Sequence, residues 1–582
     1  MGTKRSKVAV ILILCAYFVL IFNTAFSISG TALQDPDSCW LLAMGRRIFV
    51  TKEIPQADPF SHTLSPKRDG GGSLNLPDFV PYQWLSEVVL YSVYRGYESF
   101  VVGSDDSITK DLNFADLIKK RLSKYLPASG ADTANFGPPD PAAVSLLALA
   151  SLVIVFAFLG IPFWLTAGAR ENPLLALLLV WVSTWSASFH FYVRPEIFSY
   201  LFLAIHLALV NSIRLKGRGQ SGGSGEFKAF IPELVALTLL SILWSNFHSG
   251  FVCGILFLGV IFVMELSKLV LVSEKNPLVL KAVVLSLALS VSGSFVTPFG
   301  VRLFQYLPHL FFDKTNTLIE ELRPLTVPEI LSSSYLPYLL FSVLSILAVS
   351  YCGRAADRRV LGHIVMNGLV IVAAIAVGYS CRRLIPFTSL FILFETLFVF
   401  ALTAREVAGL IPLRDPDSIA AAMAPLYKNR RNWLSLGGTA CVVLLSSFMV
   451  GKAFLPSIPQ VNYAFAAPFD ALAFIQKSKF TGNLFNDPQY GDLMVWHLYP
   501  SPPVFIDTRF DAYGSEVVFD TFKIENASAG WQKLLERHEI KWVFVPANSM
   551  LAHKLKDSAD WHQEFRDNIA VVYSKKPKER AE

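Results

Sequence analysis

The sequence predicts a polytopic α-helical membrane protein with about eleven spanning helices and a small α/β domain at its C-terminus. Three observations support this fold class. Of the 582 residues, 53% are hydrophobic and only 16% are charged, whereas soluble domains carry about 25% charged residues. The apolar residues form separate runs that are long enough to cross a bilayer as helices. The last part of the chain lacks such runs and alternates short strand-like and helical patterns.

The first apolar run follows Lys4, Arg5 and Lys7, as in a signal peptide, but it is too long for a signal-peptide core. We therefore interpret it as a retained spanning helix. A long polar segment follows, and then the other apolar runs. The predicted spans cover residues 8–28, 142–168, 173–189, 197–213, 229–247, 249–266, 277–297, 335–352, 361–380, 384–403 and 433–454.

The short loops predict the orientation of these spans. Basic residues, including Lys216, Lys268, Arg354 and Arg405, gather in the loops at one end. Because basic loops face the cytoplasm, the N-terminus is predicted to be cytoplasmic and the C-terminal domain extracytoplasmic. The net charge of only +6 and the absence of a stacking motif give no indication of a nucleic-acid partner.

We predict two domains: a transmembrane domain over residues 1–454, which includes a large first outer loop at 29–141, and a soluble domain over 455–582. Apolar residues at helical spacing predict amphipathic helices within the first loop. These helices cover residues 38–50 and 82–94. The tail pattern predicts strands at 503–506, 541–546 and 570–574, with helices at 468–479 and 531–538.

Asp35 and Asp37 directly follow the first span. Two carboxylates two residues apart can chelate a divalent cation or supply a general base. The alternative is a structural role for Asp37 as the N-cap of the helix that follows it. Spacing alone leaves both readings open.

Three further candidates lie in the same loop. Asp58 and His62 belong to the segment Asp58-Pro59-Phe60-Ser61-His62, for which an ordinary turn is the alternative reading. Glu87 follows on the next predicted helix, where it faces either the site or solvent.

Basic and histidine side chains gather at the predicted outer ends of the spans. An arginine fork suits a phosphate, whereas interfacial anchoring, or a satisfied polar group in the case of the histidines, is the structural alternative. Together with the acids, these residues predict one mixed-charge cavity at the outer membrane boundary. They are His190, Arg194, His248, Arg302, Arg382 and Arg383.

Two other features of the sequence each have two interpretations. Glu395 lies within a span, where an acid is costly and has either a functional or a hydrogen-bonded structural role. In the tail, Asn486, Asp487, Asp507, Arg509 and Asp511 either bind sugar or acceptor, or, in the case of Asp507 and Arg509, form a structural ion pair.

Several segments carry a resemblance to a known superfamily. They include DPDSCWLLAMGRRI at 35–48, RPEIFSYL at 194–201, RRLIPF at 382–387 and NDPQYGDLMVWHLYPSPPVFIDTRFDAYG at 486–514. In these segments the chain resembles the GT-C superfamily of membrane glycosyltransferases, and more closely a bacterial branch of multi-spanning proteins.

The resemblance implies a GT-C-like fold and transfer of a sugar from a polyprenyl phosphate or diphosphate, with inversion, to an acceptor hydroxyl on a glycan, lipid or protein. Asp37 matches the catalytic acid best, followed by Asp35, with Asp58 or Glu87 as a second acid. Many relatives carry two adjacent acids here, whereas Ser38 follows Asp37 in this chain.

The implied phosphate-side and substrate-binding residues are the arginines and histidines named above, with His62 added. Asp35 and Asp37 are the implied ligands of a divalent cation such as Mg²⁺ or Mn²⁺. The implied location is the bacterial inner membrane, with a role in the cell envelope. The alternatives are a transporter or flippase of a lipid-linked glycan and a non-catalytic membrane scaffold. The one-sided distribution of polar clusters favours the enzyme, since transporters carry paired repeats and mid-membrane sites.

Overall fold

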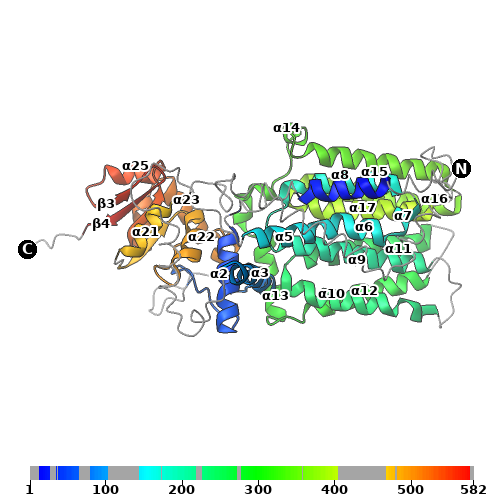
Figure 1. Ribbon diagram of the computed structural model, residues 1–582, viewed down its shortest axis with the longest axis horizontal. Helices are drawn as coiled ribbons and strands as arrows, with labels where there is room; N and C mark the ends of the chain where they lie inside the picture. Colours follow the sequence, from blue (N-terminus) through cyan, green and yellow to red (C-terminus); the bar gives the residue numbers. More distant parts are fainter. Residues whose placement is uncertain are drawn as a thin grey trace, which may run out of the picture. The chain divides into compact units, whose positions relative to one another are not determined.

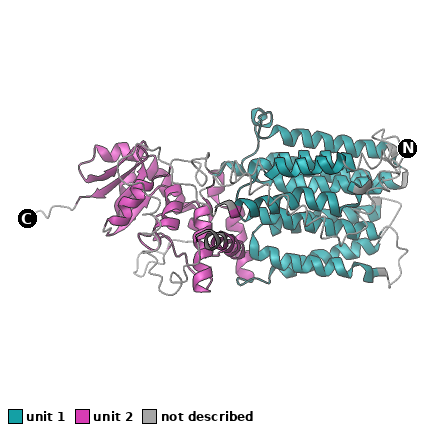
Figure 2. Ribbon diagram, viewed as in Figure 1, with its two compact units in different colours: residues 1–32, 147–300, 319–451 teal, residues 33–146, 301–318, 452–582 magenta. Residues whose placement is uncertain are grey.

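The computed structural model describes residues 12–25, 35, 37–64, 79–102, 143–171, 173–217, 226–271, 277–356, 358–403, 467–478 and 481–576. The chain forms two compact units, which Figure 2 colours separately. Unit 1 comprises residues 1–32, 147–300 and 319–451, and unit 2 comprises residues 33–146, 301–318 and 452–582.

Unit 1 is a bundle of long apolar helices (Figure 1). Its principal elements are α5 (Ala143–Val155), α6 (Ile161–Leu165), α8 (Pro173–Ala187), α9 (Glu196–Gly217), α10 (Ile231–Phe247), α11 (Phe251–Leu271), α12 (Pro277–Ser294), α15 (Leu336–Ala355), α16 (Arg358–Ser380) and α17 (Ile385–Leu402). A helix satisfies its own backbone hydrogen bonds, so it is the regular structure that such apolar runs can adopt in lipid.

Nine helices among the described residues are long and apolar enough to cross a membrane. They coincide with nine of the predicted spans, including the tight hairpin in which α10 ends at Phe247 and α11 begins at Phe251. A shorter apolar helix, Leu12–Ala25, lies within the first predicted span. The predicted span at 433–454 lies outside the described residues. The predicted polytopic helical class is confirmed.

Of the nine candidate spans, the one that contains α17 is the most enclosed, and 89% of its apolar stretch is buried. A helix that is covered on all sides needs apolar residues around its whole circumference, as α17 has. Peripheral helices instead expose apolar side chains such as Leu256, Val263 and Leu369, which suit contact with lipid.

Within α17, Glu395 is fully buried and meets Arg214 of α9, with 2.7 Å between Oε1 and Nη1. The same guanidinium donates to Asn211 and Asn367, each at 2.7 Å, and to Glu265 at 3.2 Å. The Glu395 carboxylate is therefore part of an ion-pair and amide cluster that joins four helices, which is the structural reading of this intramembrane acid.

The predicted span at 142–168 is not one regular helix. A π-helical turn, η2 (Phe156–Gly160), separates α5 from α6, and Thr166 then adopts an extended conformation before α7 (Ala167–Glu171) begins. Gly168 of α7 lies against the backbone of α17, where an added Cβ would meet the Leu397 carbonyl oxygen at 1.8 Å. A larger residue would not fit at this crossing.

Unit 2 combines the first loop with the tail of the chain. Its elements are α2 (Asp37–Thr51), α3 (Trp84–Val102), α13 (Val301–Phe312), α21 (Phe469–Lys477), β1 (Asn483–Asn486), α22 (Pro488–His497), α23 (Phe510–Glu525), α24 (Trp531–Arg537), β2 (Ile540–Pro546), α25 (Met550–Lys556), β3 (Trp561–Arg566) and β4 (Ala570–Lys575). The two predicted first-loop helices correspond to α2 and α3, and the predicted small α/β domain is confirmed.

The sheet of unit 2 has the strand order β1-β2-β4-β3. β1 pairs with β2 in parallel, while β4 is antiparallel to both of its neighbours. The helices of the tail lie beside this sheet in Figure 1. Buried residues such as Phe485, Val543 and Val571 form its core.

The first loop is hydrogen-bonded directly to the tail. Ser61 and Val504 form an isolated parallel bridge, in which Val504 donates to the Phe60 carbonyl and His62 donates to the Val504 carbonyl, both at 3.0 Å. The predicted strand at 503–506 is therefore wrong, because its partner is this short loop and not the sheet. The two units are groups of residues that pack together. The predicted domain boundary near residue 454 instead divides membrane-spanning from water-soluble segments. That boundary stays a prediction.

Candidate active site

Asp35 and Asp37 mark the start of α2. The Asp35 Oδ1 atom accepts the backbone N–H of Asp37 at 3.3 Å, and the Asp35 carbonyl accepts that of Ser38. Asp35 is 3% exposed, while Asp37 is half-buried. The side chain that accepts a backbone N–H at the start of the helix is thus that of Asp35, and Asp37 presents the more accessible carboxylate.

The Asp37 carboxylate is held by a residue of the tail. Thr508 Oγ1 lies 2.5 Å from Asp37 Oδ1 and 2.9 Å from Asp492 Oδ2. The Thr508 backbone N–H also donates to Asp492 Oδ1 at 3.2 Å. Because a hydroxyl has a single hydrogen, it cannot donate to both acids, and one of the two carboxyls must donate to it.

Of the two acids, Asp492 is the one whose pKa is raised. Burial raises the pKa of Asp492 well above its ordinary value, and the nearby carboxylates of Asp37 and Asp507 raise it further, against the hydrogen bonds from Thr508. When Asp492 is protonated, it donates to the Thr508 oxygen, and the Thr508 hydroxyl then donates to Asp37. This chain of donors stabilises Asp37 as a carboxylate, which is the form that a general base requires.

A second group of acids surrounds Arg509. The guanidinium donates to Asp507 at 2.5 Å (Nη2 to Oδ2) and to Asp58 at 2.7 Å (Nη1 to Oδ1). Burial would lower the pKa of Arg509, but these two carboxylates raise it well above its ordinary value. The other Asp58 oxygen accepts the backbone N–H of Ser61 at 2.8 Å. The structure thus contains both the Asp507–Arg509 ion pair and the turn at Asp58.

The other candidate residues of unit 2 make contacts that are typical of structural roles. His62 Nε2 lies 3.0 Å from the Leu484 carbonyl oxygen, and burial lowers the pKa of His62 to about 4, so the ring is a neutral donor. Arg302 of α13 makes a long contact of 3.4 Å with Gln56. In the tail, the Asp487 side chain caps α22 and Asp511 accepts the Tyr306 hydroxyl at 2.9 Å.

Glu87 of α3 is 1% exposed, and its Oε2 atom has no hydrogen-bond partner among the described residues. Burial raises the pKa of Glu87 to about 8, although Arg509 and Gln83 act in the opposite direction. In the unfolded chain this carboxyl ionises near its ordinary value of 4.5. The contribution of Glu87 to the free energy of unfolding is therefore fully present below pH 4.5, and it is lost as the pH rises towards 8.

Replacing Glu87 with glutamine is expected to remove most of this pH dependence and to raise stability at pH 8. The wild-type loss between pH 4.5 and 8 is on the order of 5 kcal/mol at most, since one pKa unit corresponds to about 1.4 kcal/mol. Thermal unfolding of the purified protein at pH 5, 6.5 and 8 measures the effect. Glu53→Gln changes an exposed carboxyl of the same loop and is the matched control. Equal pH slopes for Glu87→Gln and wild type would contradict the expectation.

Unit 1 contains a second polar cluster, which we call the Glu196–Arg383 cluster. Arg383 forms an ion pair with Glu196, and His248 Nε2 lies 3.8 Å from the same carboxylate. His248 Nδ1 accepts the backbone N–H of Gly250 at 3.0 Å, so the proton of the neutral ring resides on Nε2 and points to Glu196.

Glu321 joins this cluster from the segment before α15. It lies 3.3 Å from His190 Nε2 and 4.0 Å from Arg194 Nη1. Burial would raise the pKa of Glu321, but the hydrogen bond with His190 and the charge of Arg194 lower it well below its ordinary range. The other His190 nitrogen contacts the Tyr200 hydroxyl at 3.0 Å.

The charges of the Glu196–Arg383 cluster balance, since Arg194 and Arg383 face Glu196 and Glu321. Both guanidiniums keep some exposure, 17% for the Arg194 side chain and 33% for that of Arg383. Arg382 instead pairs with Glu320 at 2.9 Å and Glu329 at 2.6 Å. The charge of Arg194 also acts on Glu196, and that of Arg383 acts on Glu321, so His190, Arg194, His248 and Arg383 surround one pair of carboxylates. Arg382 has separate partners.

Reasoning from sequence missed four participants: Asp492, Thr508, Glu196 and Glu321. The first three lie within segments that carry the family resemblance, and that is the signal that could have revealed them. Glu321 has no comparable signal. Asp37 belongs to unit 2, whereas Arg194 and Arg383 belong to unit 1, so their convergence in one cavity stays a prediction.

The described residues include no group of three or more His, Cys, Asp or Glu side chains that could hold a metal ion. The Asp35 carboxylate is almost fully buried and already accepts a backbone N–H, so only Asp37 offers an accessible oxygen. A cation site on Asp35 and Asp37 therefore stays a prediction, and the chemistry proposed below uses side chains alone.

No protein-family model matches the chain, and no curated protein matches it significantly. Among solved structures, the oligosaccharyltransferase of Archaeoglobus fulgidus in the apo form matches over 97% of this chain and 74% of its own, at 10% identity and a TM-score of 0.50. ArnT from Cupriavidus metallidurans matches in the apo state over 98% of both chains, at 13% identity and a TM-score of 0.47.

The ArnT structure bound to undecaprenyl phosphate matches over 97% of both chains, at 15% identity and a TM-score of 0.45. Sequence identities this low support a conclusion about fold alone, and that conclusion rests on the oligosaccharyltransferase match, which extends over nearly the whole chain. The chain shares the fold of this oligosaccharyltransferase, in agreement with the GT-C-like fold that its sequence resemblance implies.

Proposed function

We propose that this protein is a membrane glycosyltransferase that transfers a sugar from a polyprenyl phosphate or diphosphate to an acceptor hydroxyl at the extracytoplasmic face. The observation that carries the proposal is the chain Asp492–Thr508–Asp37. It supplies a half-buried carboxylate in the first turn of α2, soon after the first apolar helix, in a protein with the GT-C fold.

In the proposed reaction, Asp37 accepts the proton of the acceptor hydroxyl as its oxygen attacks the anomeric carbon. The bond between that carbon and the phosphate oxygen breaks, and the phosphate leaves with the electron pair. A single displacement inverts the anomeric configuration. Arg194 and Arg383 would stabilise the departing phosphate, for which the planar guanidinium is well suited.

Thr508→Val is expected to lower kcat about tenfold to a hundredfold and to leave KM unchanged. It removes a hydrogen bond to a charged group, which is worth about 1.5–3 kcal/mol. The acid limb of the pH–rate profile should also move to higher pH, because the Asp37 carboxylate loses a donor. Thr508→Ser keeps the hydroxyl and should retain the wild-type profile. A valine variant with an unchanged pH profile would argue against the donor chain.

The direct test supplies the purified full-length protein with a panel of polyprenyl-phosphate and polyprenyl-diphosphate sugars. Sugar release and transfer are followed by mass spectrometry, and the anomeric configuration of any product is determined. We expect turnover of at least one donor, with inversion. Silence across the panel from folded protein, or movement of labelled glycolipid across proteoliposomes without transfer, would contradict the proposal, and the second result would favour a flippase.

A further inference from the structure

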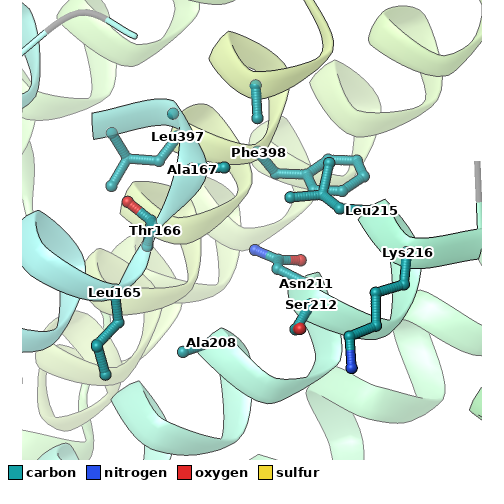
Figure 3. Close-up of a pocket in the computed structure, with 12 residues that line it drawn as sticks. Leu165, Thr166, Ala167, Ala208, Asn211, Ser212, Leu215, Lys216, Leu397 and Phe398 are labelled. Atoms are coloured by element: carbon teal, nitrogen blue, oxygen red, sulfur yellow. The ribbon is translucent and has the colours of Figure 1, made fainter. Parts of the chain in front are cut away.

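A cavity with a volume of about 340 Å³ lies within unit 1 (Figure 3). Its walls come from the break between α6 and α7, the end of α9 and the end of α17. Glu196 begins α9, whereas Lys216 lies near its other end. With a rise of about 1.5 Å per residue, these residues are about 30 Å apart, the thickness of a bilayer core.

The walls of the cavity are mixed: Leu397 and Phe398 contribute apolar surface, and Thr166, Asn211 and Ser212 contribute polar groups. Its rims differ in chemistry. Leu165 is 45% exposed on a predicted span and suits contact with lipid, whereas the Lys216 side chain is 40% exposed. A cavity with one apolar rim and one cationic rim matches a ligand that is itself amphiphilic.

The Lys216 ammonium retains capacity for a ligand. It donates to Glu233 Oε1 at 2.6 Å and to the Ala229 carbonyl at 3.1 Å, which accounts for two of its three hydrogens among the described contacts. Because Glu233 balances the charge, the site suits a singly charged anion better than a polyanion. A phosphodiester carries one negative charge and accepts hydrogen bonds.

A further donor lies deeper in the cavity. The Asn211 amide gives one hydrogen to the Phe394 carbonyl at 3.2 Å, and its oxygen accepts from Arg214 at 2.7 Å. The amide has a second hydrogen, and Figure 3 shows its nitrogen on the same side of the cavity as Thr166. These bonds fix the amide, so it presents a rigid donor to a ligand.

We propose that this cavity binds the phosphodiester headgroup of an anionic membrane lipid. The phosphate would accept from Lys216 and Asn211, and the first carbons of the lipid would lie against Leu165. The site is separate from the proposed transfer chemistry and does not depend on it. Under the predicted orientation it faces the cytoplasmic leaflet, where basic pockets between helices are suited to anionic headgroups.

Delipidated full-length protein is titrated with phosphatidylglycerol in detergent, and binding is measured by native mass spectrometry. Lys216→Ala is expected to weaken binding about fivefold to tenfold, the effect of one interfacial lysine. Ala208→Leu, which fills the cavity without changing charge, should weaken binding at least as much. Lys281→Ala removes an exposed lysine of α12 that does not line the cavity and should bind as wild type.

Phosphatidylcholine and inorganic phosphate are the two comparison ligands in this binding experiment. Both should bind at least tenfold more weakly than phosphatidylglycerol, which would assign the site to an anionic lipid. Equal binding of inorganic phosphate, or wild-type binding by both Lys216→Ala and Ala208→Leu, would overturn the proposal. Melting temperatures of the variants without lipid, if equal to wild type, attribute lost binding to the cavity and not to misfolding.

Discussion

Asparagine in place of Asp37 is expected to lower the rate of sugar transfer about 10²- to 10⁴-fold, because a positioned general base contributes about that much. The substitution keeps the size of the side chain and leaves an oxygen that can accept the Thr508 hydroxyl, which lies 2.5 Å from Asp37 in the wild type. The fold should therefore survive, and donor binding should change little.

Initial rates with a saturating acceptor measure this effect, and thermal unfolding reports on the fold. Glu53→Gln neutralises an exposed carboxyl in the same loop and is the control for charge. Asp35→Asn tests the second-ranked acid, and we expect a smaller loss because Asp35 is 3% exposed and accepts a backbone N–H. Near wild-type transfer by Asp37→Asn would remove the proposed base, while a larger loss with Asp35→Asn would exchange the two roles.

Arg214→Met is expected to destabilise unit 1 by about 3–5 kcal/mol, the cost of leaving one partner of a buried ion pair without the other. Arg214 is 1% exposed, and its guanidinium binds both Glu395 and Glu265. It also stacks on the Phe398 ring at 3.7 Å. Methionine fills much of the volume but leaves the buried Glu395 carboxylate without its cation, whereas Glu265 keeps Lys268 at 2.8 Å.

Thermal unfolding of the purified variants measures this loss. The double variant Arg214→Met with Glu395→Gln should regain part of the stability, because one unpaired carboxylate is removed. Arg354→Met changes an exposed arginine of α15 and should melt as wild type does. A single variant as stable as wild type would show that the cluster contributes little, as occurs when desolvation offsets the attraction between charges.

The membrane helices were predictable because lipid imposes one solution on a long apolar run, namely a helix that satisfies its own backbone. The break at Thr166 was not predictable, since it lies beside the tertiary contact of Gly168 with α17, which no local pattern records. In the tail, β2 and β4 have the apolar pattern of buried strands. β1 and β3 were missed because β1 has only four residues and β3 is largely exposed.

The candidate site was likewise predictable only in part from the sequence. Asp37 stood out because it forms a pair of carboxylates with Asp35 directly after the first span, and Arg194 because it lies at a predicted outer end, away from the basic cytoplasmic loops. Their partners did not stand out, since Thr508 meets Asp37 across 471 positions and no local pattern records that contact. Glu321 is an ordinary surface-type residue until folding brings it to His190, 131 positions away. Tertiary pairing therefore supplied what composition and spacing could not.

The pairing of the first loop with the tail has a consequence for biosynthesis. Asp58 and Arg509 are separated by 451 positions, and ribosomes add about 5–20 residues per second. The loop therefore leaves the ribosome about 20–90 s before its partner exists. During that interval Asp58 has no counter-ion from Arg509, and a nascent chain truncated before the tail should expose this loop to proteases that the completed protein resists.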